Sequence, residues 1–168
     1  MIDDLVSKIV EFLEASGKVD WAEQLGNESI RLPTNLEMVL FDEHGNVKEK
    51  RNVHNLICTV GKRKLLASAS PETMNQFAYI AIGTGTTAAS ASDTALQTEI
   101  ARNIATVSNP DADHLQIQYT FPAGTGTGAI TEAGIFDAST GGIILAHQVF
   151  AVINKGASDP FQMTWTLS

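Results

Sequence analysis

The sequence predicts a mainly β protein: an antiparallel β-sandwich of the jelly-roll or immunoglobulin-like kind, with an N-terminal helical arm. Residues 161–167 (FQMTWTL) alternate strictly between apolar and polar side chains, and residues 115–121 (LQIQYTF) repeat this pattern. Such alternation is typical of a strand with one buried and one solvated face. Strand candidates recur with little helix between them, which favours a sandwich of about seven to nine strands.

The first 26 residues are predicted to form the helical arm. After an acidic N-cap at residues 3–4, the apolar stripe of the helix consists of Leu5, Ile9, Phe12 and Leu13. Such a stripe needs a partner surface, either on the chain's own domain or on a neighbouring subunit. Residues 27–35 (NESIRLPTN) lack a period and contain Pro33, so we expect an extended linker before a β-sandwich domain at residues 36–168.

The first half of this domain opens with a predicted hairpin. Leu36–Phe41 and Val47–Val53 flank a turn at residues 42–46, and residues 55–60 are expected to continue or re-pair that second strand. Residues 61–70 suit a short helix. Phe77–Ile82 is the most apolar run, which predicts a central strand covered on both faces.

The second half is predicted to be strand-rich to its end. Asp93 should cap a short turn, followed by strands at Glu99–Val107 and Leu115–Phe121. Residues 130–168 predict three further strands, with a tight turn at residues 139–142 (STGG). Alternation in the last strand places Trp165 in the core.

Charge and composition exclude several classes of function. The net charge is −8, which disfavours nucleic-acid binding, and the acids concentrate in residues 1–50, with eleven acids against five bases. No apolar run reaches the roughly 18–20 residues of a membrane span, and the acidic start does not resemble a signal peptide. The single cysteine, Cys58, lies in an apolar run and is expected to be a buried small hydrophobe.

No active site emerges from the motifs, so we expect no enzyme, cofactor, metal or small-molecule substrate. Residues 83–88 (GTGTTA) approach the dinucleotide-binding pattern but precede no adequate helix, and residues 62–64 (KRK) are expected to be a solvated helix face. The four histidines show no metal-ligand spacing. Glu132, Asp137 and Asp159 are interpreted as turn and edge residues rather than a catalytic carboxylate pair.

Three segments carry a resemblance to a known family: residues 79–102 (YIAIGTGTTAASASDTALQTEIAR), 130–142 (ITEAGIFDASTGG) and 145–168. Their succession resembles a family of small tailed-bacteriophage virion structural proteins, described as head-decoration (cement) or tail-fibre-like proteins. The resemblance covers about residues 36–168. It implies a non-catalytic subunit of the virion, assembled in the host bacterial cytoplasm.

From this resemblance we expect a capsid decoration or cement subunit. It would form a homo-oligomer and contact other virion proteins, either the major capsid protein or tail proteins. A tail, baseplate or tail-fibre attachment component is the alternative within the class. A carbohydrate-binding module is a more distant alternative, since Trp21, Tyr79 and Trp165 could supply a stacking platform.

Overall fold

The computed structural model describes residues 34–67, 77–111 and 114–167, except the side chains of residues 65–67. The chain divides into two units, Met1–Arg31 and Leu32–Ser168, and every described residue belongs to the second. The predicted arm at residues 1–26, with its stripe of Leu5, Ile9, Phe12 and Leu13, therefore lies outside the described residues. The predicted linker does too, apart from its last two residues.

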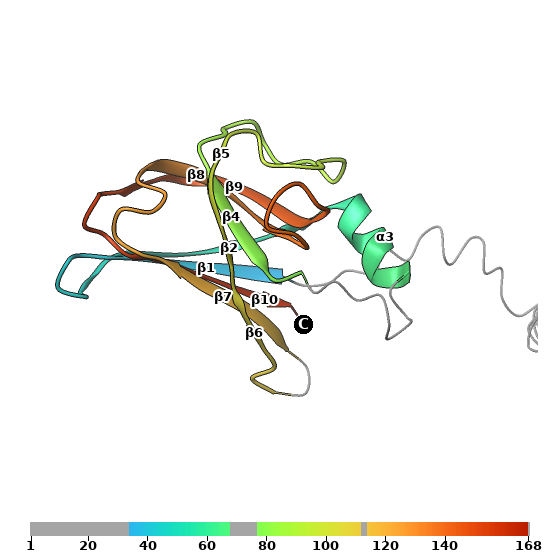
Figure 1. Ribbon diagram of the computed structural model, residues 1–168, viewed down its shortest axis with the longest axis horizontal. Coiled ribbons are helices and arrows are strands. Elements are labelled where there is room, and N and C mark those ends of the chain that lie inside the picture. Colours follow the sequence, from blue (N-terminus) through green and yellow to red (C-terminus); the bar gives the residue numbers. More distant parts are fainter. Residues whose placement is uncertain (1–33, 68–76, 112–113, 168) are drawn as a thin grey trace, which may run out of the picture. The chain divides into compact units, whose positions relative to one another are not determined.

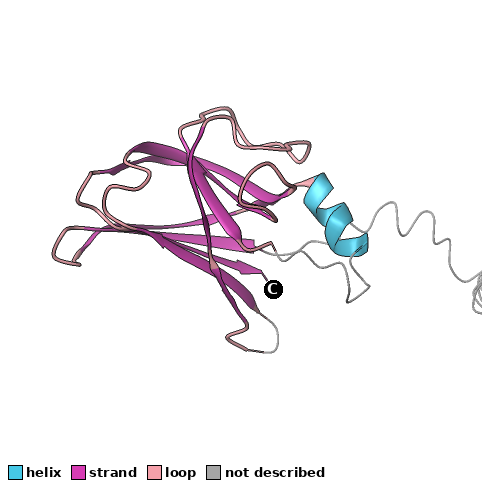
Figure 2. Cartoon of the chain, in the orientation of Figure 1, coloured by secondary structure: helices cyan, strands magenta, loops and turns pink. Residues whose placement is uncertain are grey.

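Two five-stranded antiparallel sheets pack face to face as a β-sandwich in this described part (Figures 1 and 2). The first sheet has the order β2-β1-β10-β7-β6, and its strands are β1 (Thr34–Phe41), β2 (Val47–His54), β6 (Thr106–Ser108), β7 (Leu115–Phe121) and β10 (Phe161–Leu167). The second has the order β3-β9-β8-β4-β5, and its strands are β3 (Leu56–Ile57), β4 (Tyr79–Gly83), β5 (Glu99–Ile104), β8 (Gly128–Phe136) and β9 (Ile144–Lys155). The mainly β, sandwich-like prediction is confirmed.

Two predicted strands differ from the structure at their boundaries. The predicted Glu99–Val107 strand is in fact β5 and β6, which lie in different sheets, because the chain crosses the sandwich at Ala105. β1 begins at Thr34, so the last two residues of the predicted linker already pair with β10. Together with the short β3, these divisions give ten strands in the described residues, more than the seven to nine expected.

The segment after the first hairpin passes to the second sheet. β3 pairs with β9 instead of continuing β2, and the helix α3 (Thr59–Ala67) follows directly. Lys64 in α3 forms an ion pair with Asp137 beyond the end of β8. The predicted short helix is confirmed over residues 61–67; it begins earlier, at Thr59, and residues 68–70 lie outside the described residues. No helix within the described ranges has the length and apolar character needed to cross a bilayer.

The core lies between the sheets and follows the alternation in the sequence. From the first sheet, Met163 and Trp165 of β10 are fully buried, and Ile80, Ile82 and Ile135 face them from the second sheet. The predicted core position of Trp165 is confirmed. Its side chain therefore cannot provide a stacking platform for a sugar.

The outer side of the second sheet has a smaller apolar cluster. Cys58, Ala81, Leu96, Phe136 and Ile144 are buried there. Because Ala81 faces this cluster while Ile80 and Ile82 face the main core, β4 is covered on both faces, as its apolar sequence predicts.

Replacement of Trp165 should leave a cavity between the sheets. We expect Trp165→Ala to lower the free energy of unfolding by about 3–5 kcal/mol, measured by urea denaturation. Thr166→Ala, which changes an outward-facing neighbour on the same strand, should cost much less. Equal losses for the two variants would contradict the core assignment.

Candidate functional site

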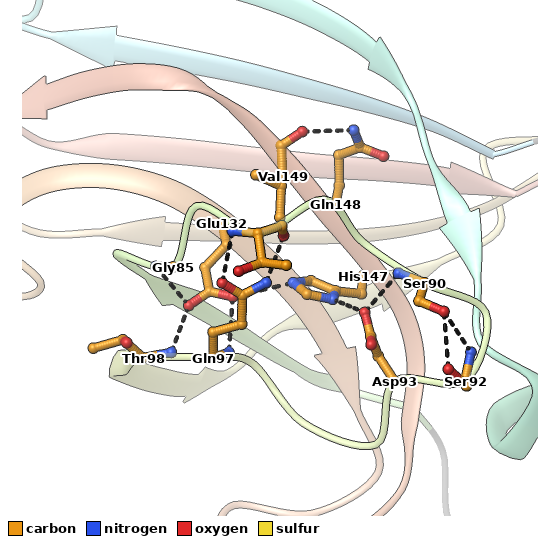
Figure 3. A network of polar contacts seen from close by, with 11 residues as sticks. Gly85, Ser90, Ser92, Asp93, Gln97, Thr98, Glu132, His147, Gln148 and Val149 are labelled. Carbon is orange, nitrogen blue, oxygen red and sulfur yellow. Dashed lines mark hydrogen bonds and ion pairs between the residues drawn. The ribbon is translucent and has the colours of Figure 1, made fainter.

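The most unusual side chain in the second sheet is the fully buried carboxylate of Glu132, in the middle of β8. Its two oxygens accept hydrogen bonds from the backbone N–H groups of Gly85 (2.9 Å), Gln97 (2.9 Å) and Thr98 (2.7 Å) (Figure 3). Burial of a charged group is strongly unfavourable unless hydrogen bonds replace its water. These amides therefore make a buried carboxylate tolerable in this layer.

The imidazole of His147, in β9, lies between Glu132 and Asp93 (Figure 3). Its Nε2 is 3.1 Å from Glu132 Oε2 and its Nδ1 is 2.6 Å from Asp93 Oδ2. Both ring nitrogens can donate to carboxylates only in the imidazolium form. We call Glu132, His147 and Asp93, with the amides that bind them, the Glu132 network.

The Glu132 network fixes the loop between β4 and β5, residues 84–98. Further bonds hold the same loop: Thr131 Oγ1 donates to Gly85 O (2.7 Å), and the Thr87 N–H donates to Gln97 Oε1 (2.9 Å). Leu96 anchors it in the outer apolar cluster. Irregular loops of this length are uncommon in compact domains and usually have a function.

Close approach of Glu132 explains the glycines at the start of this loop. A Cβ on Gly83 would lie 2.5 Å from Glu132 Oε1, and a Cβ on Gly85 would lie 2.6 Å from the same atom. The glycines in the GTGTTA segment thus admit the chain's own carboxylate, which occupies the Gly85 amide that a pyrophosphate would need.

Asp93 does not cap a short turn through Leu96 and Gln97, contrary to the sequence-based prediction. Its carboxylate accepts the Ser90 N–H (2.8 Å) and faces His147, because the segment that follows it remains irregular. Burial alone would raise the pKa of Asp93, but the hydrogen bonds from Ser90 and His147 outweigh it and hold this pKa below the usual 3.8.

The three carboxylates considered in the sequence fall in different environments. Asp137 and Asp159 are turn residues, as predicted: Asp137 accepts the Ile143 N–H (2.7 Å), and Asp159 pairs with Lys48 (2.6 Å). Glu132 was assigned wrongly to a turn or edge, since β8 lies between β9 and β4. The structure does not bring the three together as a catalytic pair.

The remaining candidate residues are dispersed. His147 meets Asp93 and Glu132 rather than His114, which pairs with Asp111 (2.6 Å). Cys58 is buried, and desolvation raises its pKa to about 12, so its thiol is not a nucleophile at neutral pH. Tyr79 packs against the outer apolar cluster, and Trp21 lies outside the described residues.

The contacts of the Glu132 network position the loop that follows β4. The hydroxyl of Ser90, whose amide binds Asp93, is hydrogen-bonded to Ser92 Oγ (2.9 Å). In the part of the chain that the structure covers, no group of three or more His, Cys, Asp and Glu side chains is arranged to hold a metal ion. What the network does is hold a loop of small residues in one conformation.

Comparison of the chain with known protein families, characterised proteins and solved structures finds no match.

The loss of the charge on Glu132 should release the loop. In Glu132→Gln an NH₂ group replaces one carboxylate oxygen, so a donor faces the donors that the oxygen used to accept. We therefore expect the free energy of unfolding to fall by about 2–4 kcal/mol. Amide hydrogen exchange at Gly85, Gln97 and Thr98 should accelerate. Glu43→Gln makes the same chemical change at a side chain that is 65% exposed and should alter neither quantity. An unchanged exchange rate at the three amides would contradict the proposed role of the Glu132 network in holding the loop.

Asp93 should make stability depend on pH. Folding lowers the pKa of Asp93. Its contribution to stability is therefore present when the pH is above the pKa of the unfolded chain, near 3.8, and is lost as the pH falls through the lower pKa of the folded protein. Asp93→Asn should therefore be less stable than the parent at pH 7, and the difference should shrink by pH 3. Urea unfolding of both proteins at the two pH values measures this, and a difference that stays constant would contradict it.

Proposed function

We propose that this protein is a non-catalytic structural subunit of a tailed-bacteriophage virion, and within that class a capsid decoration or cement protein. One observation carries the proposal. The three segments that resemble the phage family are the ones that build the Glu132 network: Asp93 and Gly85 come from the first, Glu132 from the second and His147 from the third. The resemblance thus lies in parts of the chain that meet in space.

The character of the loop held by this network supports the same proposal. Residues 84–98 contain one charged side chain, Asp93, and it is turned inward to His147. The rest of the exposed loop is mostly Thr, Ala and Ser. A fixed loop with small neutral side chains suits contact with another protein, since little side-chain entropy is lost when it is covered.

The partners in this proposal are the major capsid protein and further copies of the chain, and the localisation is the virion, assembled in the bacterial cytoplasm. The proposal includes the helical arm at residues 1–26 and the jelly-roll or immunoglobulin-like subdivision of the sandwich. Repeated passage of the chain between the two sheets supports that subdivision, with β10 returning between β1 and β7.

A tail, baseplate or tail-fibre attachment role is the second candidate, because the same resemblance includes tail-fibre-like proteins. The two roles differ in what removal of the subunit would do. Particles without a decoration protein should keep their tails and lose heads on heating or osmotic shock. Particles without a tail component should have stable heads and defective tails, and electron microscopy of the particles distinguishes these outcomes.

Deletion of residues 1–26 tests the assembly arm. We expect residues 27–168 to remain folded, with an unchanged far-ultraviolet circular dichroism signature of β structure, while incorporation into particles falls. The reason is that burial of Leu5, Ile9, Phe12 and Leu13 on a neighbour would contribute about 1.5–3 kcal/mol for each fully buried side chain. Leu5→Ser with Ile9→Ser in the full chain should reproduce the loss of incorporation. A truncated protein that aggregates would instead assign the stripe to the domain's own core.

A further inference from the structure

The outward face of the first sheet is unusually poor in charge. On β7 and β10 its side chains are Gln116, Gln118, Thr120, Gln162, Thr164 and Thr166, which the strand register places side by side. Thr106 and Ser108 of β6 extend the same face. We call these side chains the amide–hydroxyl face. Every outward position on the three strands is Gln, Thr or Ser, although the whole chain carries a net charge of −8.

The adjoining strands β1 and β2 add little net charge to this side of the sheet. On β1 and β2, Glu37 and Lys50 lie on the same side of the sheet and neutralise each other in an ion pair of 2.8 Å. Depletion of charge is the compositional feature that distinguishes the centre of a protein interface from ordinary surface.

Side chains of the amide–hydroxyl face are already ordered by one another. Gln118 Nε2 donates to Thr164 Oγ1 (2.9 Å), and Gln162 Nε2 donates to Thr120 Oγ1 (3.2 Å). Thr164, at the centre, is buried by its neighbours. A partner would therefore meet two glutamine side chains, Gln118 and Gln162, that hydrogen bonds already restrain, which reduces the entropy lost on binding.

We propose that the amide–hydroxyl face binds the same face of a second copy of this chain about a two-fold axis. Each Gln, Thr and Ser side chain can both donate and accept hydrogen bonds, so the face is complementary to itself. A neutral face also avoids the repulsion that two copies of net charge −8 meet elsewhere. Nucleic acid would need cations, and an apolar helix would need an apolar groove.

The outer side of the whole first sheet, which adds β1 and β2 to the amide–hydroxyl face, fits a weak dimer. Four of its five strands have seven or eight residues and β6 has three. At about 4.8 Å between strands and about 3.3 Å per residue, they present roughly 520 Å² per copy, or about 1,050 Å² in all. This is near the lower limit for a specific interface, so we expect a micromolar dissociation constant rather than an obligate dimer. The inference concerns the isolated protein in solution and does not rest on the proposed virion role.

Sedimentation equilibrium of the full chain across micromolar to millimolar concentration tests the proposal. Thr120→Glu places a like charge on the exposed part of the face in both copies, and it should raise the dimer dissociation constant about tenfold or more. Thr140→Glu makes the same substitution at an exposed turn position outside the face and should leave the constant unchanged. Thermal unfolding of the three proteins checks that each is folded.

Gln118→Ala provides a second variant that adds no charge, and it should weaken the dimer without preventing folding. Dimerisation of the parent and Thr140→Glu, with both face variants shifted toward monomer, would support the proposal. A parent that stays monomeric up to millimolar concentration would overturn it, as would face variants that dimerise as strongly as the parent. A monomeric parent that binds a neutral glucan such as dextran, with binding lost in Gln118→Ala, would assign the face to a sugar and also overturn it.

Discussion

Burial of the Glu132 carboxylate is the constraint on which the outer side of the second sheet depends. A buried charge without hydrogen-bond partners would cost several kcal/mol, and here the partners are amides of the β4–β5 connection and the His147 ring. The burial of the carboxylate therefore depends on the path of the β4–β5 loop, and the path of that loop depends on the carboxylate. If the chain returned to β5 by another path, Glu132 would be left unpaired, and without Glu132 the amides of Gly85 and Thr98 would lose their acceptor.

This mutual dependence explains how a long irregular loop can have one conformation. Ordering each residue costs about 1–2 kcal/mol of conformational entropy, and a loop without a strand ladder has few bonds to offset it. The Glu132 network supplies them at several points along residues 84–98, while Leu96 adds an apolar anchor. Small side chains fill the exposed remainder, so the surface that results is neutral and fixed in shape.

Period-2 patterns predicted the strands β7 and β10 and the core position of Trp165, because alternation along one strand records which side is buried.

The Glu132 network could not be predicted in this way. His147 and Asp93 are 54 residues apart, and their contact depends on the order of strands in the second sheet. From the sequence Glu132 was interpreted as a turn or edge residue. It lies on the outer side of the second sheet, where the β4–β5 loop covers it. A Glu and a His within largely apolar segments were the available signal, since buried charges require partners.

The edge strand β2 and the amide–hydroxyl face differ in charge. β2, an edge strand, carries Lys48, Lys50 and Arg51, and charged edges discourage strand addition. Arg51 also donates to the carbonyl oxygens of Ala151 and Val152 on β9, so main-chain acceptors of the second sheet are occupied on that side. Strand addition would be open-ended, because each added strand presents a new edge. Contact through side chains of a sheet face closes after two copies. A charged edge at β2 beside a neutral face would therefore favour the limited, face-to-face association that we propose over open-ended strand addition.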